Sequence, residues 1–195
     1  MRTSTPSEPR RAVFLDRDGT LIEEVGYLDR LDRLVLYPYT VDAVRILNRA
    51  GFAVVVVTNQ AGIARGIVEE AFVGEAHRHI AERLEAGGAK VDAFYYCPHY
   101  TTGTVQPYVR ACDCRKPQPG LLLRAQADLD LDLAGSFTVG DRWHDIAAGR
   151  AAGTRTVLLR SGLGRREASA PPPGLAPDAV ADTLIDAAAW ILQHA

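Results

Sequence analysis

The sequence predicts an α/β fold in which helices cover both faces of a doubly wound, mostly parallel sheet. Apolar, β-branched runs that suit buried strands alternate along the chain with segments of helical periodicity, which is the pattern of such a sheet. Three of the expected strands end in polar signatures, Asp16-Arg17-Asp18, Thr58-Asn59 and Gly140-Asp141. Because parallel strands bring their carboxyl ends to one edge, where open α/β sheets bind ligands, these side chains should converge on one site.

The length and composition predict a single domain. The chain has 195 residues, a formal net charge of -2, and no apolar run near the roughly 20 residues of a membrane span. Residues 1–11 are rich in Ser, Thr, Pro and Arg and lack the apolar region of a secretory signal, so we expect a disordered lead-in before a domain at 12–195. A net charge of -2 gives no global basic field, so we expect no binding to nucleic acid. The missing signal and the missing apolar run predict a cytoplasmic protein that does not bind membrane, and we expect it to be a monomer.

The N-terminal half predicts three strands and two helices. Residues 12–15 are a short apolar run, 52–57 form a continuous β-branched run that suits a doubly buried strand, and 91–96 form the third strand. The first helix opens at Pro38, which favours a first helical turn, and closes before Gly51. Between the strands we also expect a loop at 21–36 and a helix at about 68–86, with His77 and His79 at its surface.

The C-terminal half predicts a long loop followed by alternating helices and strands. Residues 97–117 contain all three cysteines, and a loop of this length in a compact domain is usually either functional or disordered. The elements that follow are expected to be a helix at 119–129, a strand at 136–139, a helix at 143–152 and a strand at 156–159. The Gly- and Pro-rich residues 161–177 are expected to be mobile, and Asp178 to cap a last helix that packs through Val180, Leu184, Ala188 and Ile191.

The acidic residues at the predicted strand ends indicate phosphoryl chemistry. Two carboxylates as close as Asp16 and Asp18 repel each other unless a cation lies between them, and Mg²⁺ suits such oxygen ligands. Asp16 can attack phosphorus to give an aspartyl-phosphate, while Asp18 can protonate the leaving oxygen and then activate water. Asp141 can complete the ligands of the metal, whereas Asp145, four residues later, fits either a capping role or a ligand role.

Polar residues on neighbouring segments can bind the transferring phosphoryl group. Thr58 and Asn59 can donate hydrogen bonds to its oxygens, and Lys116 can neutralise their charge. The alternatives are that Thr58-Asn59 is only a turn at the end of a strand and that Lys116 is a solvated surface lysine. His144 is expected at the rim of the site, in a packing role rather than a catalytic one.

The cysteine loop predicts a structural zinc site. Cys97-x-His99 and Cys112-x-Cys114 are separated by twelve residues and supply three thiolates and an imidazole, the ligand set of a closed Zn²⁺ site. Metal binding can order a segment that lacks apolar periodicity. A cysteine nucleophile is the weaker alternative because it does not explain the pairing. Arg115 follows this anchor, and its planar fork suits a second anionic or hydroxyl-rich group, the alternative being a solvated arginine.

Taken together, these motifs resemble those of the haloacid dehalogenase superfamily. Its four motifs correspond, in order, to Asp16-x-Asp18-Gly19-Thr20, Val57-Thr58-Asn59, Lys116 and Gly140-Asp141-x-x-x-Asp145. The resemblance covers Val13 to about Leu159 and implies a Rossmann-like fold of the phosphatase branch. It also implies that Asp16 is the nucleophile and that Mg²⁺ is held by Asp16, the Asp18 carbonyl and Asp141. The short segments between motifs leave no room for a cap domain, so loops must select the substrate.

The cysteine motif is similar to that of the zinc-containing, histidinol-phosphatase-like subgroup. Within it, the twelve-residue spacer is similar to that of the enzymes that act on heptose bisphosphates, since the histidinol phosphate phosphatases usually carry a shorter one. The resemblance implies removal of the 7-phosphate of a heptose 1,7-bisphosphate for heptose precursors, with histidinol phosphate as the alternative substrate. The substrate contacts that it implies are Glu24, Val25, Gly26, Tyr27, Thr58, Asn59, Gln60, Ala61, Arg115, Lys116 and Arg142.

Two positions depart from the pattern of the heptose-acting enzymes. Arg142 stands where they commonly have Lys, which keeps the charge but changes reach and hydration. Ala61 stands where a small hydroxyl residue is often found. Two other functional classes remain as alternatives: a non-catalytic, zinc-stapled interaction module, which the complete acidic motif set argues against, and a nucleic-acid end phosphatase, which the net charge of -2 argues against.

Overall fold

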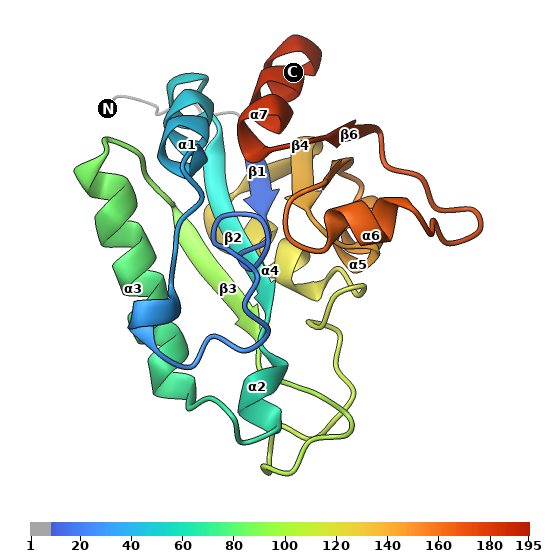
Figure 1. The fold of residues 1–195 in the computed structure, drawn as a ribbon. Coiled ribbons are helices and arrows are strands. Elements are labelled where there is room, and N and C mark those ends of the chain that lie inside the picture. The colour runs from blue at the N-terminus through green and yellow to red at the C-terminus, as the bar shows by residue number, and fades with distance from the viewer. Residues whose placement is uncertain (1–8) are drawn as a thin grey trace, which may run out of the picture.

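The computed structural model describes residues 9–195, and residues 1–8 of the expected lead-in lie outside that part. Within it, six parallel strands form one sheet in the order β3-β2-β1-β4-β5-β6 (Figure 1). The strands are β1 (Arg10–Leu15), β2 (Ala53–Asn59), β3 (Ala93–Cys97), β4 (Leu131–Gly140), β5 (Arg155–Leu159) and β6 (Ala179–Ala181). Helices cover both faces, so the predicted doubly wound α/β fold is confirmed.

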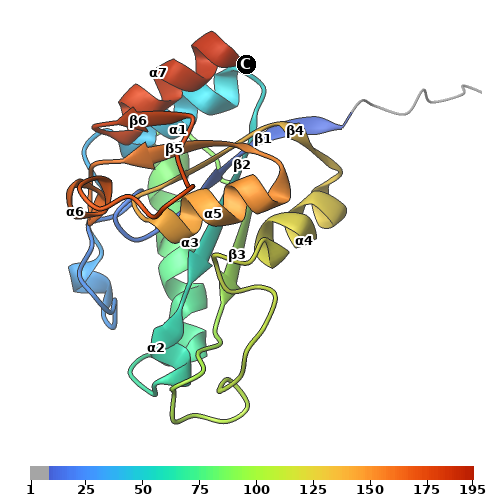
Figure 2. The same cartoon turned by 90° about the vertical axis from the view of Figure 1, so that its right-hand side faces the viewer.

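The helices divide between the two faces of the sheet, which Figure 2 shows from the β6 edge. One face carries α1 (Thr40–Arg49), α3 (Glu70–Ala86) and α7 (Leu184–His194), and the other carries α4 (Gly120–Leu129) and α5 (Trp143–Ala152). The short helices are α2 (Ala61–Ala64), α6 (Gly164–Ala168) and the 3-10 turn Leu31–Arg33. No helix in residues 9–195 is both long enough and apolar enough to cross a bilayer.

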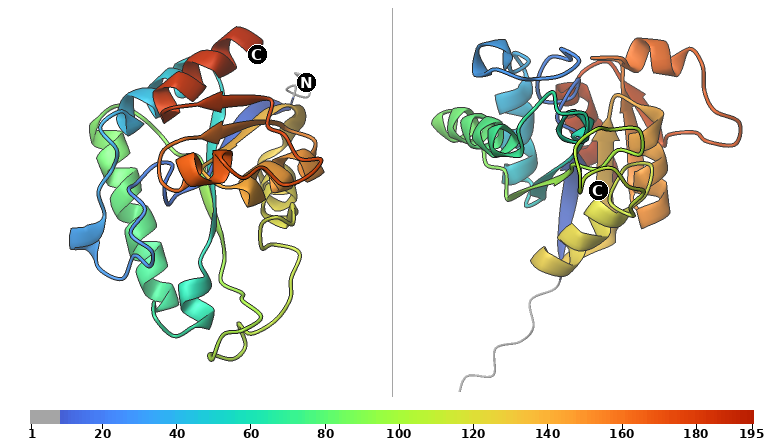
Figure 3. Two further views of the ribbon diagram at one scale, coloured as in Figure 1. Left: turned by 45° about the vertical axis from the view of Figure 1, so that its right-hand side comes forward. Right: turned by 90° about the horizontal axis from the view of Figure 1, so that it is seen from below.

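β1 is a central strand, and its position fixes the place of the site. Val13 and Leu15 face the core under α1, α3 and α7, whereas Phe14 faces the core under α4 and α5. β1 pairs with β2 on one side and with β4 on the other, so the strand order reverses there, and α/β sheets bind ligands at the carboxyl end of such a point. This edge points downwards in Figure 1, and Figure 3 shows that the loop after β3 lies beside α2 there.

Two strands begin earlier than the sequence predicts. β1 starts at Arg10, so residues 10 and 11 of the expected lead-in belong to the sheet. β4 starts at Leu131 rather than Ser136, and its register against β1 is irregular. The carboxylate of Asp132 accepts hydrogen bonds from two backbone amides that follow it. These bonds satisfy the backbone at the irregularity, which is why residues with a loop-like composition continue the strand.

The last helix begins later than predicted. α7 starts at Leu184, and the side chain of Thr183 accepts a backbone hydrogen bond from its first turn. Asp178, the expected cap, instead accepts hydrogen bonds from the backbone amide and the hydroxyl of Thr156 on β5. It therefore anchors the short edge strand β6, and Val180 is 44% exposed on that strand rather than packed on a helix.

A buried histidine is a further correction. His77 was expected at the surface of its helix, but it is 6% exposed and stacks on Phe94 with ring centroids 4.7 Å apart. Burial lowers the pKa of His77 to about 3, and the Arg17 guanidinium acts in the same direction. His77 is therefore a neutral, apolar-packed side chain of α3 near the active edge of the sheet.

Candidate active site

The polar ends of three strands meet at the predicted edge of the sheet. Asp16 directly follows β1, and Asp141 directly follows β4. Oxygen atoms of Asp16, Asp141 and Asp145 lie within 4.8 Å of one another. All three residues are at least nine-tenths buried, with exposures of 6%, 0% and 0%. The structure thus brings Asp16 and Asp141, two of the predicted strand-end carboxylates, together with Asp145 of α5.

Lys116 connects two of these carboxylates. Its Nζ atom donates hydrogen bonds to Asp16 Oδ1 and to the carbonyl of Val57, both at 2.7 Å, and lies 2.6 Å from Asp145 Oδ1. Lys116 is 2% exposed, so it is not the solvated lysine of the alternative interpretation. Burial opposes its charge, but the carboxylates of Asp145 and Asp16 raise the pKa of Lys116 above its ordinary value.

Asp145 orients the cluster. Its Oδ2 atom accepts a hydrogen bond from the backbone amide of Arg142 at 3.1 Å and caps α5, while Oδ1 faces Lys116. Burial opposes ionisation of Asp145, but the neighbouring Lys116 and His144 lower its pKa below the ordinary value. Both oxygens are thus engaged by the protein, which favours the capping and orienting role over that of a metal ligand.

Asp16 and Asp141 carry charge that the protein only partly neutralises. Burial raises the pKa of Asp16 to about 7, against the lowering effect of Lys116. Burial and the nearby Asp16 raise the pKa of Asp141 to about 8. Asp141 Oδ2 accepts a hydrogen bond from the Leu163 amide at 2.8 Å, but its buried Oδ1 has no hydrogen-bond partner within the described part of the chain. An orphaned carboxylate oxygen beside a second carboxylate fits a divalent cation.

Two glycines leave room for the carboxylate of Asp141. A Cβ atom on Gly19, which has a φ of +79°, would lie 2.2 Å from Asp141 Oδ2, and one on Gly162 would lie 2.3 Å from it. Ser161 Oγ joins the two segments by donating to the carbonyl of Gly19 at 2.7 Å. Residues 161–163 were not predicted to belong to the site, because their composition is that of a mobile linker. The available signal was the Ser161-Gly162 pair shortly after the end of β5 at Leu159.

Asp18 is held by a network that includes an unpredicted residue. The guanidinium of Arg17, 2% exposed, donates to both oxygens of Asp18 at 3.1 and 2.9 Å. Gln60 Nε2 donates to Asp18 Oδ2 at 3.0 Å and to Thr58 Oγ1 at 2.8 Å. The sequence motif assigns no role to Arg17, which lies between Asp16 and Asp18. Its burial was not visible in the sequence, since arginine is among the residues least often buried.

Asn59 uses its side-chain amide to position Lys116, so this amide is not free to bind a ligand in the pocket. Its Oδ1 atom accepts from the Lys116 backbone amide, and its Nδ2 atom donates to the Lys116 carbonyl, both at 3.0 Å. The side-chain amide is thus committed to the loop after β3. This pair of bonds connects the end of β2 to the lysine, so Thr58-Asn59 is more than a turn at the end of a strand.

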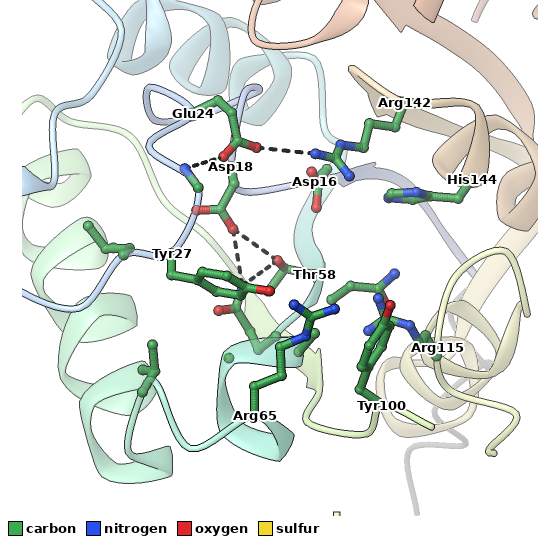
Figure 4. A pocket seen from close by; sticks show the side chains of 17 residues that line it. Asp16, Asp18, Glu24, Tyr27, Thr58, Arg65, Tyr100, Arg115, Arg142 and His144 are labelled. Carbon is green, nitrogen blue, oxygen red and sulfur yellow. Dashed lines mark hydrogen bonds and ion pairs between the residues drawn. The ribbon is translucent and has the colours of Figure 1, made fainter. Parts of the chain in front are cut away.

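Asp16 and Asp18 line a pocket of about 350 Å³. Nine of the eleven predicted substrate contacts line it, and the other two, Val25 and Lys116, are not among its lining residues. Glu24 and Arg142 approach each other across it at 3.8 Å, as Figure 4 shows. His144 reaches the wall beside Asp145, 3.5 Å from its Oδ1, and burial lowers the pKa of His144. The lining residues that sequence reasoning missed are Leu28, Gly62, Arg65, Val68 and Tyr100.

The predicted metal-binding residues of the cysteine loop form a compact cluster. Ligand atoms of Cys97, His99, Cys112 and Cys114 all lie within 4.8 Å of one another. The three sulfur atoms are 3.2 to 3.5 Å apart, which is too long for a disulfide of about 2.05 Å. Such a spacing and such a donor set fit a tetrahedral metal site closed by four protein ligands.

This sheet topology, with a carboxylate after a central strand and a buried lysine that bridges it to a second acid, defines a hydrolase of the haloacid dehalogenase class. Residues 113–187 match the family model described as HAD-hydrolase-like. The chain is 44% identical over 152 residues to the D-glycero-beta-D-manno-heptose-1,7-bisphosphate 7-phosphatase of Escherichia coli (strain K12), a match that spans 77% of this chain and 80% of the relative. It belongs to the family of the heptose 1,7-bisphosphate 7-phosphatases.

Solved structures agree with this assignment. The D,D-heptose 1,7-bisphosphate phosphatase from B. bronchiseptica, crystallised with magnesium and phosphate, superimposes with a TM-score of 0.85 at 32% identity and covers 95% of this chain and 99% of its own. The D,D-heptose 1,7-bisphosphate phosphatase from Burkholderia thailandensis gives a TM-score of 0.69 at 28% identity and covers 94% of this chain and 99% of its own. The predicted superfamily and phosphatase class are therefore confirmed.

Proposed function

We propose that this protein is a Mg²⁺-dependent phosphatase that removes the 7-phosphate of D-glycero-D-manno-heptose 1,7-bisphosphate, in the supply of heptose precursors. The observation that carries the proposal is the buried cluster of Asp16, Lys116 and Asp141, whose Asp16 lines a pocket with guanidinium groups on its wall. The names of the relatives, at 41% to 44% identity over most of the chain, support the same substrate.

The residues at the base of the pocket can perform a two-step hydrolysis. Asp16 attacks the phosphorus, and the bond from phosphorus to the sugar oxygen breaks as Asp18 gives that oxygen a proton. Asp18 then takes a proton from a water molecule, which attacks the aspartyl-phosphate and releases inorganic phosphate. Lys116, bonded to Asp16 at 2.7 Å, orients the nucleophile and favours its charged form.

The donor set at this site fits a magnesium ion. The carboxylates of Asp16 and Asp141 and the carbonyl of Asp18 would hold it, and the orphaned Asp141 Oδ1 supplies a ligand atom that the protein does not otherwise use. When bound, Mg²⁺ neutralises charge on the phosphoryl group and on the clustered carboxylates. Gly19 and Gly162 keep the space beside Asp141 free of side chains.

The second metal of the proposal is a structural zinc ion. Cys97, His99, Cys112 and Cys114 would bind it and leave no open position for chemistry. The ion would fix the loop that carries Arg115 and Lys116, which directly follow the last of these cysteines. A zinc ion at this site would support catalysis by placing the lysine rather than by touching the substrate.

The charge of the pocket wall favours a bisphosphate over an amine. Arg65 and Arg115 both line the wall away from the carboxylates (Figure 4). The ammonium group of histidinol phosphate would face these cations, whereas a second phosphate would be attracted by them. Heptose bisphosphate is therefore the proposed substrate, and histidinol phosphate is not favoured.

Phosphate release from a small substrate panel tests this proposal. Both anomers of heptose 1,7-bisphosphate and histidinol phosphate would be assayed side by side with and without Mg²⁺. We expect Mg²⁺-dependent release from a heptose bisphosphate anomer at a kcat/KM at least about a hundredfold above that for histidinol phosphate. Equal rates, or a preference for histidinol phosphate, would overturn the substrate assignment while leaving the phosphatase class intact.

A further inference from the structure

We infer that Arg65 binds the second, non-reacting phosphate of the substrate and that Tyr100 holds this guanidinium in place, an inference that rests on the proposed function. Arg65 directly follows α2. It lines the same pocket as Asp16, and Figure 4 shows it on the side of the pocket opposite the nucleophile. A residue so placed can meet the end of a substrate that is not being hydrolysed.

Aromatic rings hold the guanidinium of Arg65. Its Cζ atom lies 4.5 Å from the ring centroid of Tyr100 and 5.9 Å from that of Tyr27. The Cζ atom of Arg115 lies 4.7 Å from the same Tyr100 ring, and the two arginines flank this ring in Figure 4. Stacking uses the face of a guanidinium and leaves its N–H edge free to donate to an anion.

The charge of Arg65 is not neutralised by the protein. Among residues 9–195, no carboxylate lies within ion-pair distance of Arg65 or Arg115. Arg142, on the same pocket, differs because it faces Glu24 at 3.8 Å. Arg65 also lowers the pKa of Tyr100 through a side-chain hydrogen bond. Two unpaired guanidinium groups beside a phenol hydroxyl match the charge and the acceptor atoms of a phosphate dianion.

The backbone around Arg65 is fixed by the loop after β3. The amides of Thr104 and Val105 both donate to the carbonyl of Ala64, at 2.7 and 2.9 Å. The hydroxyl of Thr104 donates to the carbonyl of Arg65 itself at 3.2 Å. A Cβ atom on Gly103 would lie 2.2 Å from that Ala64 carbonyl, so the approach requires glycine. The loop that carries Tyr100 and Arg115 is thus docked on Arg65, and the three side chains are positioned before substrate binds.

The test compares substrates with and without the second phosphate. Arg65→Met is measured on heptose 1,7-bisphosphate and on heptose 7-phosphate, with Arg78→Met, an exposed arginine of α3, as the matched control. Loss of charged hydrogen bonds should raise KM for the bisphosphate about tenfold to a hundredfold, with kcat and the monophosphate constants within about twofold. Equal losses on both substrates, or no loss on the bisphosphate, would overturn the inference.

A binding measurement separates this inference from the proposed function. Heptose 1-phosphate, which keeps only the second phosphate, is titrated into wild-type protein and both variants by calorimetry. Weaker binding by about tenfold or more in Arg65→Met, and unchanged binding in Arg78→Met, supports the role of Arg65. Unchanged binding in Arg65→Met counts against it. If the wild-type protein released no phosphate from the bisphosphate, the proposed function would fail, and this titration would still decide the role of Arg65.

Discussion

At the scale of single residues, the site is a balance between burial and charge. Lys116 offsets the charges of Asp16 and Asp145, and both of its partners approach within 2.7 Å. Among residues 9–195, Asp141 forms no ion pair with a cation, and burial together with Asp16 raises its pKa to about 8. The excess negative charge is therefore concentrated on Asp16 and Asp141, the two carboxylates proposed to bind Mg²⁺.

This balance predicts a pH dependence of stability in the metal-free protein. Asp16 and Asp141 have folded-state pKa values of about 7 and 8, above their ordinary value of 3.8. The folded state therefore binds more protons than the unfolded chain between these values, so stability falls as pH rises. The contribution is full below about pH 4 and is lost as pH passes through the folded pKa values near 7 and 8.

Thermal unfolding between pH 6 and 9 checks this prediction. We expect the midpoint of the metal-free wild-type protein to fall more steeply than that of Asp141→Asn, because an amide does not titrate. Saturating Mg²⁺ should flatten the wild-type profile by stabilising the charged carboxylates. Parallel profiles for the two metal-free proteins would show that Asp141 does not carry the raised pKa.

At the scale of elements, two loops complete the site that the strands begin. The loop after β3 brings Lys116 and Arg115, and its Tyr108 hydroxyl donates to Glu70 at the start of α3 at 2.5 Å. The segment after β5 brings Gly162 and the Leu163 amide to Asp141. Neither loop has the apolar periodicity of a helix or strand, so polar contacts and metal ligands determine its conformation.

The zinc proposal predicts how the loop after β3 responds to the loss of one ligand. Cys112→Ser should lose bound zinc, and protease cleavage within residues 98–119 should become faster because the loop is no longer anchored. Activity should fall as a consequence, since Lys116 and Arg115 lie on the same segment. Metal analysis and limited proteolysis measure both effects. Retention of one zinc ion per chain together with unchanged cleavage would remove Cys112 from the ligand set.

The segment after β5 gives a second prediction with a matched control. Gly162→Ala places a Cβ 2.3 Å from Asp141 Oδ2, so it should displace that carboxylate and weaken Mg²⁺ activation about tenfold or more. Gly174→Ala is the matched control because Gly162 and Gly174 both have a positive φ, of +52° and +76°, which strains any residue with a side chain. Within the described part of the chain, no atom lies within 4 Å of a Cβ added to Gly174. Gly174→Ala should cost about 1 kcal/mol of stability and leave the Mg²⁺ dependence unchanged. Similar Mg²⁺ activation in the two variants would argue against the view that Gly162 leaves space needed by the Asp141 carboxylate.

At the scale of the whole molecule, the sequence predicts the features that follow from local residue patterns, namely the sheet and the residues at the ends of its strands. Alternating strands and helices define the parallel sheet, and the polar strand ends place Asp16, Thr58 and Asp141 together. The burial of Arg17 was not predictable, because it depends on Gln60 and Asp18 meeting around the guanidinium. Arg65 was missed for a related reason: only the docking of the loop after β3 brings Tyr100 against it.

The central claim concerns which phosphate is hydrolysed and by which residue. Phosphorus NMR of the reaction with heptose 1,7-bisphosphate identifies the product directly, and Asp16→Asn serves as the blank. We expect heptose 1-phosphate and inorganic phosphate in the presence of Mg²⁺, and turnover lower by about a thousandfold or more in Asp16→Asn. Formation of heptose 7-phosphate, or near-wild-type turnover by Asp16→Asn, would contradict this claim.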